Sequence, residues 1–178
     1  MYLASTFVQE CVYKQFSEEN RHGLIRFISG AVGNPLLSSI RGGLFEAHGH
    51  QRLCSGETFK IRLQSEPGPG FGSAETSVWF EPLATRDVSH VSDIRPGYYC
   101  RAVAKNFEWI DSQIAPDTLF QITASDKHAI KHSGLEKLKD KLGSSGEIRQ
   151  YFVVPSDRYA GFQRQNYKYR WYGRFFNI

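Results

Sequence analysis

Cysteine is scarce in this chain of 178 residues, and its positions exclude a disulfide framework. The three cysteines, Cys11, Cys54 and Cys100, are odd in number, lie far apart and form no CxxC pair. We therefore expect reduced, mostly buried thiols and a cytosolic or nuclear compartment, because structural disulfides persist mainly in oxidising compartments.

Long apolar runs are also lacking. No segment approaches the roughly 20 apolar residues that a membrane-spanning helix needs, so we expect no membrane partner. The N-terminus has no basic region followed by an apolar run, which a secretory signal peptide would have. If the protein is secreted, its targeting signal is expected to lie outside this chain.

Loops that bind nucleotide phosphates are missing as well. The P-loop pattern GxxxxGK[ST] does not occur, and neither do the HRD and DFG motifs of kinases. Gly68, Gly70 and Gly72 come close to a kinase glycine loop, but Ser73 stands where GxGxxG requires its last glycine. The sequence therefore predicts neither a P-loop NTPase nor a kinase.

The histidine pairs do not predict a zinc site. His48 and His50 are two residues apart on a predicted helix, and their side chains therefore point to different faces. His128 and His132 are four residues apart and can share a helical face, but surface or helix-capping roles are more common for such residues.

What the chain contains fits one ordinary soluble α/β domain. Hydrophobic residues make up 40% and aromatic residues 14%, which is enough for a sizeable core. The formal net charge of +4 is compatible with an anionic partner such as nucleic acid, although many basic proteins bind none.

Hydrophobic periodicity predicts helices near the N-terminus and strands after residue 56. The predicted helices cover residues 4–16, 17–30, 34–53 and 135–142, with Ser17 as an N-cap and Pro35 in a first helical turn. The predicted strands cover residues 58–63, 75–83, 98–103, 109–114, 118–124 and 150–154, and residues 65–73 and 85–96 are expected to be irregular. This order predicts a small mixed sheet flanked by helices, with residues 1–33 as a helical extension and residues 34–178 as the main domain.

Two acids and one amide side chain fall on separate predicted elements. Glu46 lies on a helix, Asp111 on an apolar strand, and Gln121 on the next strand. A lone acid in an apolar strand is costly to bury unless something binds it, and Mg²⁺ prefers such oxygen ligands. A bound ion would polarise a phosphodiester and activate water. Because only a short turn at 115–117 separates the two strands, we expect them to be antiparallel neighbours.

The same three residues also fit a structural interpretation. Asp111 would cap a turn, Gln121 would satisfy a backbone group, and Glu46 would be a solvated helix residue. Spacing alone favours this second interpretation, and a resemblance to a known family shifts the balance.

Three stretches resemble the C-terminal domain of Crinkler-type proteins, which is related to retrotransposon-hot-spot proteins of trypanosomatids. They are residues 39–48 with 56–63, residues 106–114, and residues 119–123 with 128–131, 134–135, 151–155, 162 and 165. The resemblance covers about residues 36–166 and is specific in its order. It implies an α/β restriction-endonuclease-like (PD-(D/E)xK-type) core, an effector role in a host cell, and an upstream NTPase domain that is not in this chain.

Carried over to this sequence, the resemblance makes Glu46 the helix acid, Asp111 the central ligand of Mg²⁺ or Mn²⁺, and Gln121 the third ligand. All three are then catalytic as well as metal-binding residues. The sequence departs from the restriction-type pattern at Thr123, where such sites usually carry a lysine.

A lysine at that position normally orients the attacking water and stabilises the charge that develops. Lys105, Lys127 or Lys131 would have to reach the site in its place. His128 is a further candidate as general base, because histidine titrates near neutral pH. Without one of these residues, the site is expected to bind metal poorly or to be inactive.

The stretch 158–176 interleaves basic and aromatic residues. Its cations include Arg164, Lys168, Arg170 and Arg174, and nucleic-acid binding is one interpretation, because aromatic rings stack on bases and cations neutralise phosphates. Arg41 and Arg62 are further candidate contacts near the site. The other interpretation is a core-packing terminal strand with a solvated basic face.

Two classes of function therefore stay open. The first is a metal-dependent endonuclease, a phosphodiester hydrolase acting on nucleic acid, foremost DNA, as a virulence effector in the nucleus or cytoplasm of a host cell. The second is a catalytically degenerate fold that binds DNA or a host protein without catalysis. Thr123 favours the second, whereas Asp111 and Glu46 favour the first.

Overall fold

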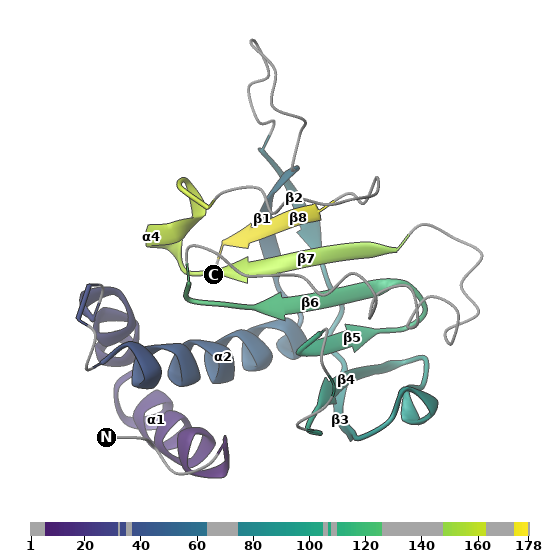
Figure 1. Ribbon diagram of the computed structural model, residues 1–178, viewed down its shortest axis with the longest axis horizontal. Coiled ribbons are helices and arrows are strands. Elements are labelled where there is room, and N and C mark those ends of the chain that lie inside the picture. The colour runs from purple at the N-terminus through teal and green to yellow at the C-terminus, as the bar shows by residue number, and fades with distance from the viewer. Residues whose placement is uncertain are drawn as a thin grey trace.

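The computed structural model describes residues 6–31, 33–34, 37–63, 75–104, 107, 110–125, 148–162 and 173–177. They form a mixed sheet with helix α2 lying across one face and helix α1 packed against α2 (Figure 1). The predicted mixed α/β architecture is thereby confirmed. No helix among these residues is both long enough and apolar enough to cross a membrane.

The element order places helices first and the sheet after them. The helices are α1 (Thr6–Gly30), α2 (Ser38–Ser55), the 3-10 helix η1 (Val91–Asp93) and α4 (Ser156–Tyr159). The strands are β1 (Thr58–Leu63), β2 (Glu75–Trp79), β3 (Ala84–Val88), β4 (Tyr98–Ala102), β5 (Ser112–Ile114), β6 (Thr118–Ile122), β7 (Arg149–Val154) and β8 (Gly173–Asn177). Their order in the sheet is β2-β1-β8-β7-β6-β5-β4-β3. The pairs β3–β4, β6–β7 and β7–β8 are parallel, and the others are antiparallel.

One hydrophobic cluster joins both long helices to the sheet. It contains Leu24 and Ile28 of α1, Phe45 of α2, Phe120 of β6 and Tyr151 of β7, all of them buried. The rings of Phe120 and Tyr151 stack with their centroids 5.7 Å apart. Residues of α1 thus share a core with the strands, while the division of the chain at residues 33 and 34 stays a prediction.

The two helices predicted in the first 30 residues are in fact one. Helix α1 runs without a break from Thr6 to Gly30, so the prediction of Ser17 as an N-cap is wrong. Serine accepts both a cap and a helix interior, and tertiary packing decides between them. Here Tyr13 before this point and Leu24 after it pack into the same core, which favours one continuous helix.

The other differences lie at element ends and at one exposed edge. Helix α2 begins at Ser38 rather than at residue 34, because the backbone before it forms turns. Residues 85–96, expected to be irregular, contain most of β3, of which only Val88 is buried, so no apolar alternation marks the strand. Strand β2 ends at Trp79 and β5 begins at Ser112, so both are shorter than predicted. The predicted loop 65–73 and helix 135–142 lie outside the described residues.

The C-terminal stretch supplies an interior strand of the sheet. Strand β8 pairs with β1 on one side and with β7 on the other. This arrangement agrees with the structural interpretation of the tail for residues 173–177, while residues 163–172 lie outside the described part.

The cysteines are free in the structure. Cys100 is buried and Cys54 is half-buried, but Cys11 is exposed, so the expectation of mostly buried thiols is wrong for Cys11.

A buried arginine on α2 links elements that are far apart in the sequence. Nε of Arg41 donates to the Ile28 carbonyl of α1 at 2.5 Å, and Nη1 donates to the Ala124 carbonyl after β6 at 3.0 Å. Nη2 lies 2.9 and 3.1 Å from the two carboxylate oxygens of Asp157 in α4. Arg41 therefore cross-links both long helices, the end of β6 and α4.

We predict that Arg41→Met destabilises the fold by about 2–4 kcal/mol, because it leaves the Ile28 and Ala124 carbonyls without their donor and removes one of the two cations beside Asp157. The matched control is Arg101→Met, which removes an ion pair to Asp87, a residue with a half-exposed side chain. That substitution is expected to cost about 0–1 kcal/mol. Urea unfolding of both variants measures the difference, and equal losses would contradict the cross-link.

Candidate carboxylate site

Asp111 and Gln121 meet at one end of the strand pair β5–β6. The two strands are antiparallel neighbours, as the short turn between them predicts. The Gln121 side chain donates from Nε2 to Oδ2 of Asp111 at 2.8 Å, and the backbone N–H of Ile122 donates to the same oxygen at 2.6 Å. Asp111 therefore satisfies a backbone group, a role that the structural interpretation assigned to Gln121.

The pKa of Asp111 is raised, which the structural role alone does not explain. Burial raises its pKa from 3.8 to about 7, and the nearby carboxylate of Glu46 contributes to the rise. The hydrogen bonds from Ile122 and Gln121 lower the pKa but do not offset the other two effects. When both carboxyl groups are ionised, two negative charges therefore stand close together without full compensation.

Glu46 approaches Asp111 because α2 packs closely on β6. A Cβ atom built at Gly49 would lie only 3.0 Å from the side chain of Ile122, so a larger residue there would require Ile122 to shift. Glu46 lies about one turn before Gly49, and its side chain is 47% exposed. The helix acid is thus accessible, whereas the strand acid is largely enclosed.

The side chains of His50, Tyr99 and Ser112 form a chain of hydrogen bonds next to the two carboxylates. His50 of α2 has its Nε2 3.8 Å from Oε1 of Glu46, and its Nδ1 lies 2.7 Å from the hydroxyl of Tyr99 in β4. The same hydroxyl lies 2.6 Å from Oγ of Ser112, the residue after Asp111. Sequence reasoning considered His50 only as half of a zinc pair and missed this role. Its spacing of four residues from Glu46 was the available signal.

The residues present fit one hard cation better than a zinc ion. Among the described residues there is no cluster of three or more histidine, cysteine, aspartate or glutamate side chains that could hold a metal. Two carboxylates and the amide oxygen of Gln121, whose nitrogen is used by Asp111, form an oxygen-only set of the kind that Mg²⁺ and Mn²⁺ accept with additional waters. A cation would also relieve the repulsion between Asp111 and Glu46.

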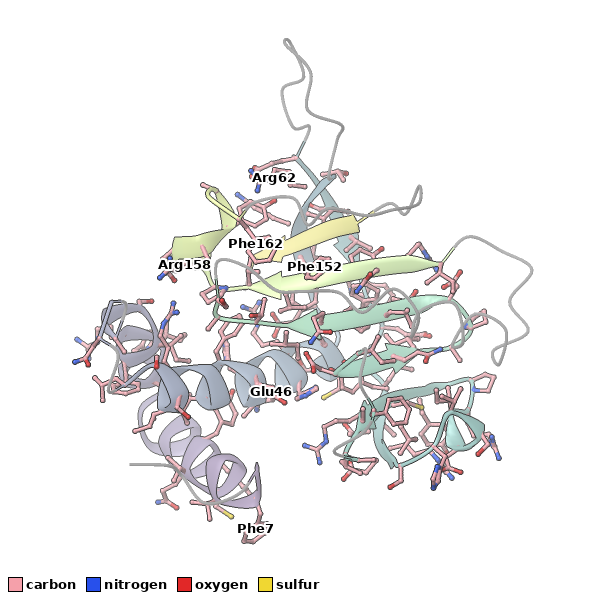
Figure 2. The ribbon with its side chains drawn as sticks, in the orientation of Figure 1. Phe7, Glu46, Arg62, Phe152, Arg158 and Phe162 are labelled. Atoms are coloured by element: carbon pink, nitrogen blue, oxygen red, sulfur yellow. The ribbon has the colours of Figure 1, made fainter. Side chains whose placement is uncertain are left out.

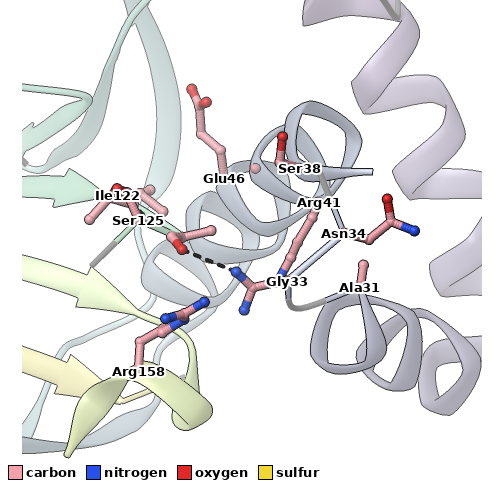
Figure 3. Close-up of a pocket in the computed structure, with 12 residues that line it drawn as sticks. Ala31, Gly33, Asn34, Ser38, Arg41, Glu46, Ile122, Ser125 and Arg158 are labelled. Atoms are coloured by element: carbon pink, nitrogen blue, oxygen red, sulfur yellow. Dashed lines mark hydrogen bonds between the residues drawn. The ribbon is translucent and has the colours of Figure 1, made fainter. Parts of the chain in front are cut away.

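A pocket of about 510 Å³ opens beside Glu46 (Figure 3). Its wall contains Ser38, Arg41 and Glu46 of α2, residues 122–125 at the end of β6, and Arg158 of α4. In Figure 3 the guanidinium groups of Arg41 and Arg158 reach towards each other. Both contact the carboxylate of Asp157. The pocket therefore has an acidic side at Glu46 and a basic side at the arginines.

Thr123, at the position where the resemblance leads us to expect a lysine, makes hydrogen bonds with the backbone. Its N–H donates to the Val153 carbonyl of β7 at 2.9 Å, and its Oγ1 accepts the N–H of Ser125 at 3.1 Å. The side chain is buried and shapes the turn that follows β6. The proposed substitutes Lys105, Lys127, Lys131 and His128 lie outside the described residues, and so do Arg164, Lys168 and Arg170.

Arg41 and Arg62 are engaged in protein contacts. Arg41 is buried in the cross-link described above. Arg62 donates to the carbonyls of Tyr159 and Ala160, and its guanidinium lies over the Tyr159 ring. In Figure 2 Arg62 lies beside α4, well apart from Glu46, and strands β8 and β7 separate β1 from β6. The structure thus does not bring Arg62 to the carboxylates, and phosphate binding by either arginine stays a prediction.

The structure is a mixed α/β fold in which the Glu46 carboxylate raises the pKa of Asp111 at one end of the β5–β6 pair. The chain is 25% identical over 166 residues to Crinkler effector proteins 16 and 15 of Phytophthora infestans, in alignments that cover 91% of this chain. This similarity supports a Crinkler-related family. The chain spans only 26% of the length of each of these relatives. No protein-family model matches the chain, and no solved structure does.

The raised pKa of Asp111 predicts that this residue costs stability at neutral pH. In the folded protein its carboxyl group keeps its proton up to about pH 7, whereas in the unfolded chain it loses the proton near pH 3.8. The cost is absent below the lower value, grows between the two, and is complete above the upper one. Asp111→Asn, which keeps an acceptor oxygen for Ile122, should therefore gain stability relative to the unmodified protein as the pH rises from 4 to 7.

Thermal unfolding at several pH values, in the presence of a chelator, measures this gain. Asp117→Asn is a control with the opposite sign. Burial tends to raise the pKa of Asp117, but hydrogen bonds from Arg149 and Thr118 outweigh it, and the pKa is lowered. That variant should lose stability relative to the unmodified protein as the pH rises. A pH-independent effect of Asp111→Asn would contradict the assignment.

Proposed function

We propose that this chain is an effector domain with a restriction-endonuclease-like core that hydrolyses phosphodiester bonds of nucleic acid, foremost DNA, with Mg²⁺ or Mn²⁺. The place of action is the nucleus or cytoplasm of a host cell. The effector role rests on the similarity to Crinkler effector proteins, and an NTPase domain elsewhere in the whole protein is part of the same proposal.

The observation that carries the proposal is the coupling of Asp111 with Glu46. The Glu46 carboxylate contributes to the raised pKa of Asp111, and a divalent cation bound between two such carboxylates would remove their repulsion. When bound, such a cation polarises a phosphodiester and activates water. Asp111 is fixed by Ile122 and Gln121, while the more exposed Glu46 remains accessible to an ion and its waters.

The pocket beside Glu46 supplies a place for the substrate phosphate. Its volume of about 510 Å³ falls within the range of small-ligand sites, roughly 300–1,000 Å³. The guanidinium of Arg158 lines the side away from Glu46 and offers a positive charge to a phosphate group. We propose Arg164, Lys168, Arg170 and Arg174 as further contacts to the nucleic-acid backbone.

Thr123 favours a second candidate, a catalytically degenerate fold that binds nucleic acid or a host protein. Its hydroxyl accepts the N–H of Ser125 in the turn after β6. Threonine also has no positive charge with which to replace the lysine. Lys105, Lys127, Lys131 or His128 has to provide this group if the domain is active. The two candidates differ in whether metal-dependent cleavage occurs.

We predict that Asp111→Ala abolishes Mg²⁺- or Mn²⁺-dependent cleavage of single-stranded DNA, duplex DNA or RNA, while the protein stays folded. Glu46→Ala should weaken cleavage, because the second carboxylate fixes the ion and its water. Gel assays with both metals measure cleavage, and Lys127→Ala, Lys131→Ala and His128→Ala identify the group that replaces the lysine. Asp87→Ala and Glu81→Ala are matched controls on exposed positions and should keep full activity.

Absence of cleavage on every substrate, together with retained nucleic-acid binding, would reject the nuclease proposal and leave the binding module. Cleavage that survives Asp111→Ala would reject the assigned site instead.

Salt dependence tests the role of the tail in binding. Replacing Arg164, Lys168 and Arg170 with glutamine should weaken DNA binding and reduce the magnitude of the log–log salt slope by roughly 0.7–0.9 for each phosphate that the protein no longer neutralises. Arg174, whose backbone lies in β8, is replaced separately so that any effect on the sheet is seen by itself. Fluorescence anisotropy at several salt concentrations measures both quantities, with Arg86→Gln on the exposed β3 as the control. An unchanged slope would show that the tail is structural.

A further inference from the structure

Ser112, Tyr99 and His50 form a chain of hydrogen bonds. Which atom donates in each bond is set by the contact of His50 with Glu46. A carboxylate only accepts hydrogen bonds, so the Nε2 atom of His50 must carry a proton to interact favourably with Glu46. In a neutral imidazole, Nδ1 is then the acceptor, and the Tyr99 hydroxyl, 2.7 Å away, must donate to it. The Tyr99 oxygen in turn accepts from the Ser112 hydroxyl at 2.6 Å.

The surroundings hold this chain in place. Tyr99 is fully buried, and its ring meets the His50 ring edge-on with the centroids 5.9 Å apart. Burial raises the pKa of Tyr99 well above its ordinary value, so its hydroxyl keeps the proton that it donates. Ser112 is also fully buried, whereas the side chain of His50 is 12% exposed at the end next to Glu46. Tyr99 and Ser112, the buried members of the hydrogen-bond chain, thus lie in the sheet, and the more exposed His50 lies next to Glu46.

The two ends of this hydrogen-bond chain lie next to the two acids. Ser112 follows Asp111 directly in the sequence, and His50 lies one helical turn after Glu46. The hydrogen-bond chain therefore connects the residue next to one carboxylate with the helix that carries the other. The distance of 3.8 Å from Nε2 of His50 to Oε1 of Glu46 exceeds hydrogen-bond distance, so orientation of Glu46 by His50 requires the half-exposed Glu46 side chain to move closer.

We propose that His50, held by Tyr99 and Ser112, is a positioning residue that orients the Glu46 carboxylate for binding a divalent cation beside Asp111. This inference rests on the cation site of the proposed function. Groups that orient the ligands of a metal contribute to its affinity, and their loss typically costs about 10–100-fold in metal affinity. His50 acts through Glu46 and needs no contact with the cation or with the nucleic acid.

The test is Mn²⁺ binding to the full chain, measured by titration calorimetry without any substrate. His50→Ala should weaken Mn²⁺ binding by roughly 10–100-fold, and His50→Gln, which keeps a donor, should recover part of the loss. Tyr99→Phe should lower the affinity less, because the His50 ring stays but its tautomer is no longer fixed. His48→Gln, two residues away in the packing of α2 against Tyr13, is the matched control and should leave the affinity unchanged.

A double-mutant cycle separates positioning from a general loss of structure. In a Glu46→Ala background, His50→Ala should cause no further loss of Mn²⁺ affinity, because there is no carboxylate left to orient. Nitrogen chemical shifts of His50 in NMR spectra give a second readout that is independent of metal. They should report a proton on Nε2 in the unmodified protein and a mixture of tautomers in Tyr99→Phe.

Mn²⁺ binding that depends on Asp111 but not on His50 would overturn this inference and leave the proposed function intact. Equal losses from His50→Ala with and without Glu46, or a proton on Nδ1 of His50, would also overturn it. If the unmodified protein binds no Mn²⁺, both this inference and the nuclease proposal fail.

Discussion

The buried guanidinium of Arg41 fixes the part of the molecule on which the candidate site depends. Its donors reach the end of α1, the turn after β6 and Asp157 of α4, three segments that lie far apart in the sequence. These segments and α2 form the wall of the pocket beside Glu46. A buried ion pair adds little net stability compared with an apolar substitute, but removing one partner is costly. The interaction therefore acts mainly by specifying how the two long helices and α4 meet the sheet.

A second constraint sets the distance between the acids. Gly49 lets α2 lie directly on Ile122, and Ile122 also donates its backbone N–H to Asp111. The close approach of helix and strand thus brings Glu46 towards Asp111 and at the same time leaves the latter partly buried. Burial and the neighbouring charge then raise the proton affinity of Asp111. The fold tolerates this unfavourable arrangement only because the rest of the core outweighs it, which is typical of functional sites.

The sequence was sufficient to predict the central strands and the contact between Asp111 and Gln121. The reason is that apolar strands joined by a short turn have few alternative pairings. It was insufficient for β3, whose side chains are mostly exposed, and for the unbroken α1, where packing rather than propensity decides. Arg41 was predicted as a phosphate contact, and its structural contacts span up to 116 residues of sequence, which no local pattern reveals. The same holds for His50 and Tyr99, which are separated by 49 residues.

The missing lysine and the Arg41 cross-link are connected through the turn after β6. The Thr123 hydroxyl accepts the N–H of Ser125, and the residue between them presents its carbonyl to Arg41. A lysine at position 123 has no oxygen to accept that N–H, so it would loosen the turn that Arg41 uses. Thr123 therefore stabilises the attachment of α2 and α4 to the sheet at the position where the resemblance leads us to expect a lysine. Under the proposed nuclease function, the catalytic cation therefore has to come from another element, whereas the proposed binding module needs none.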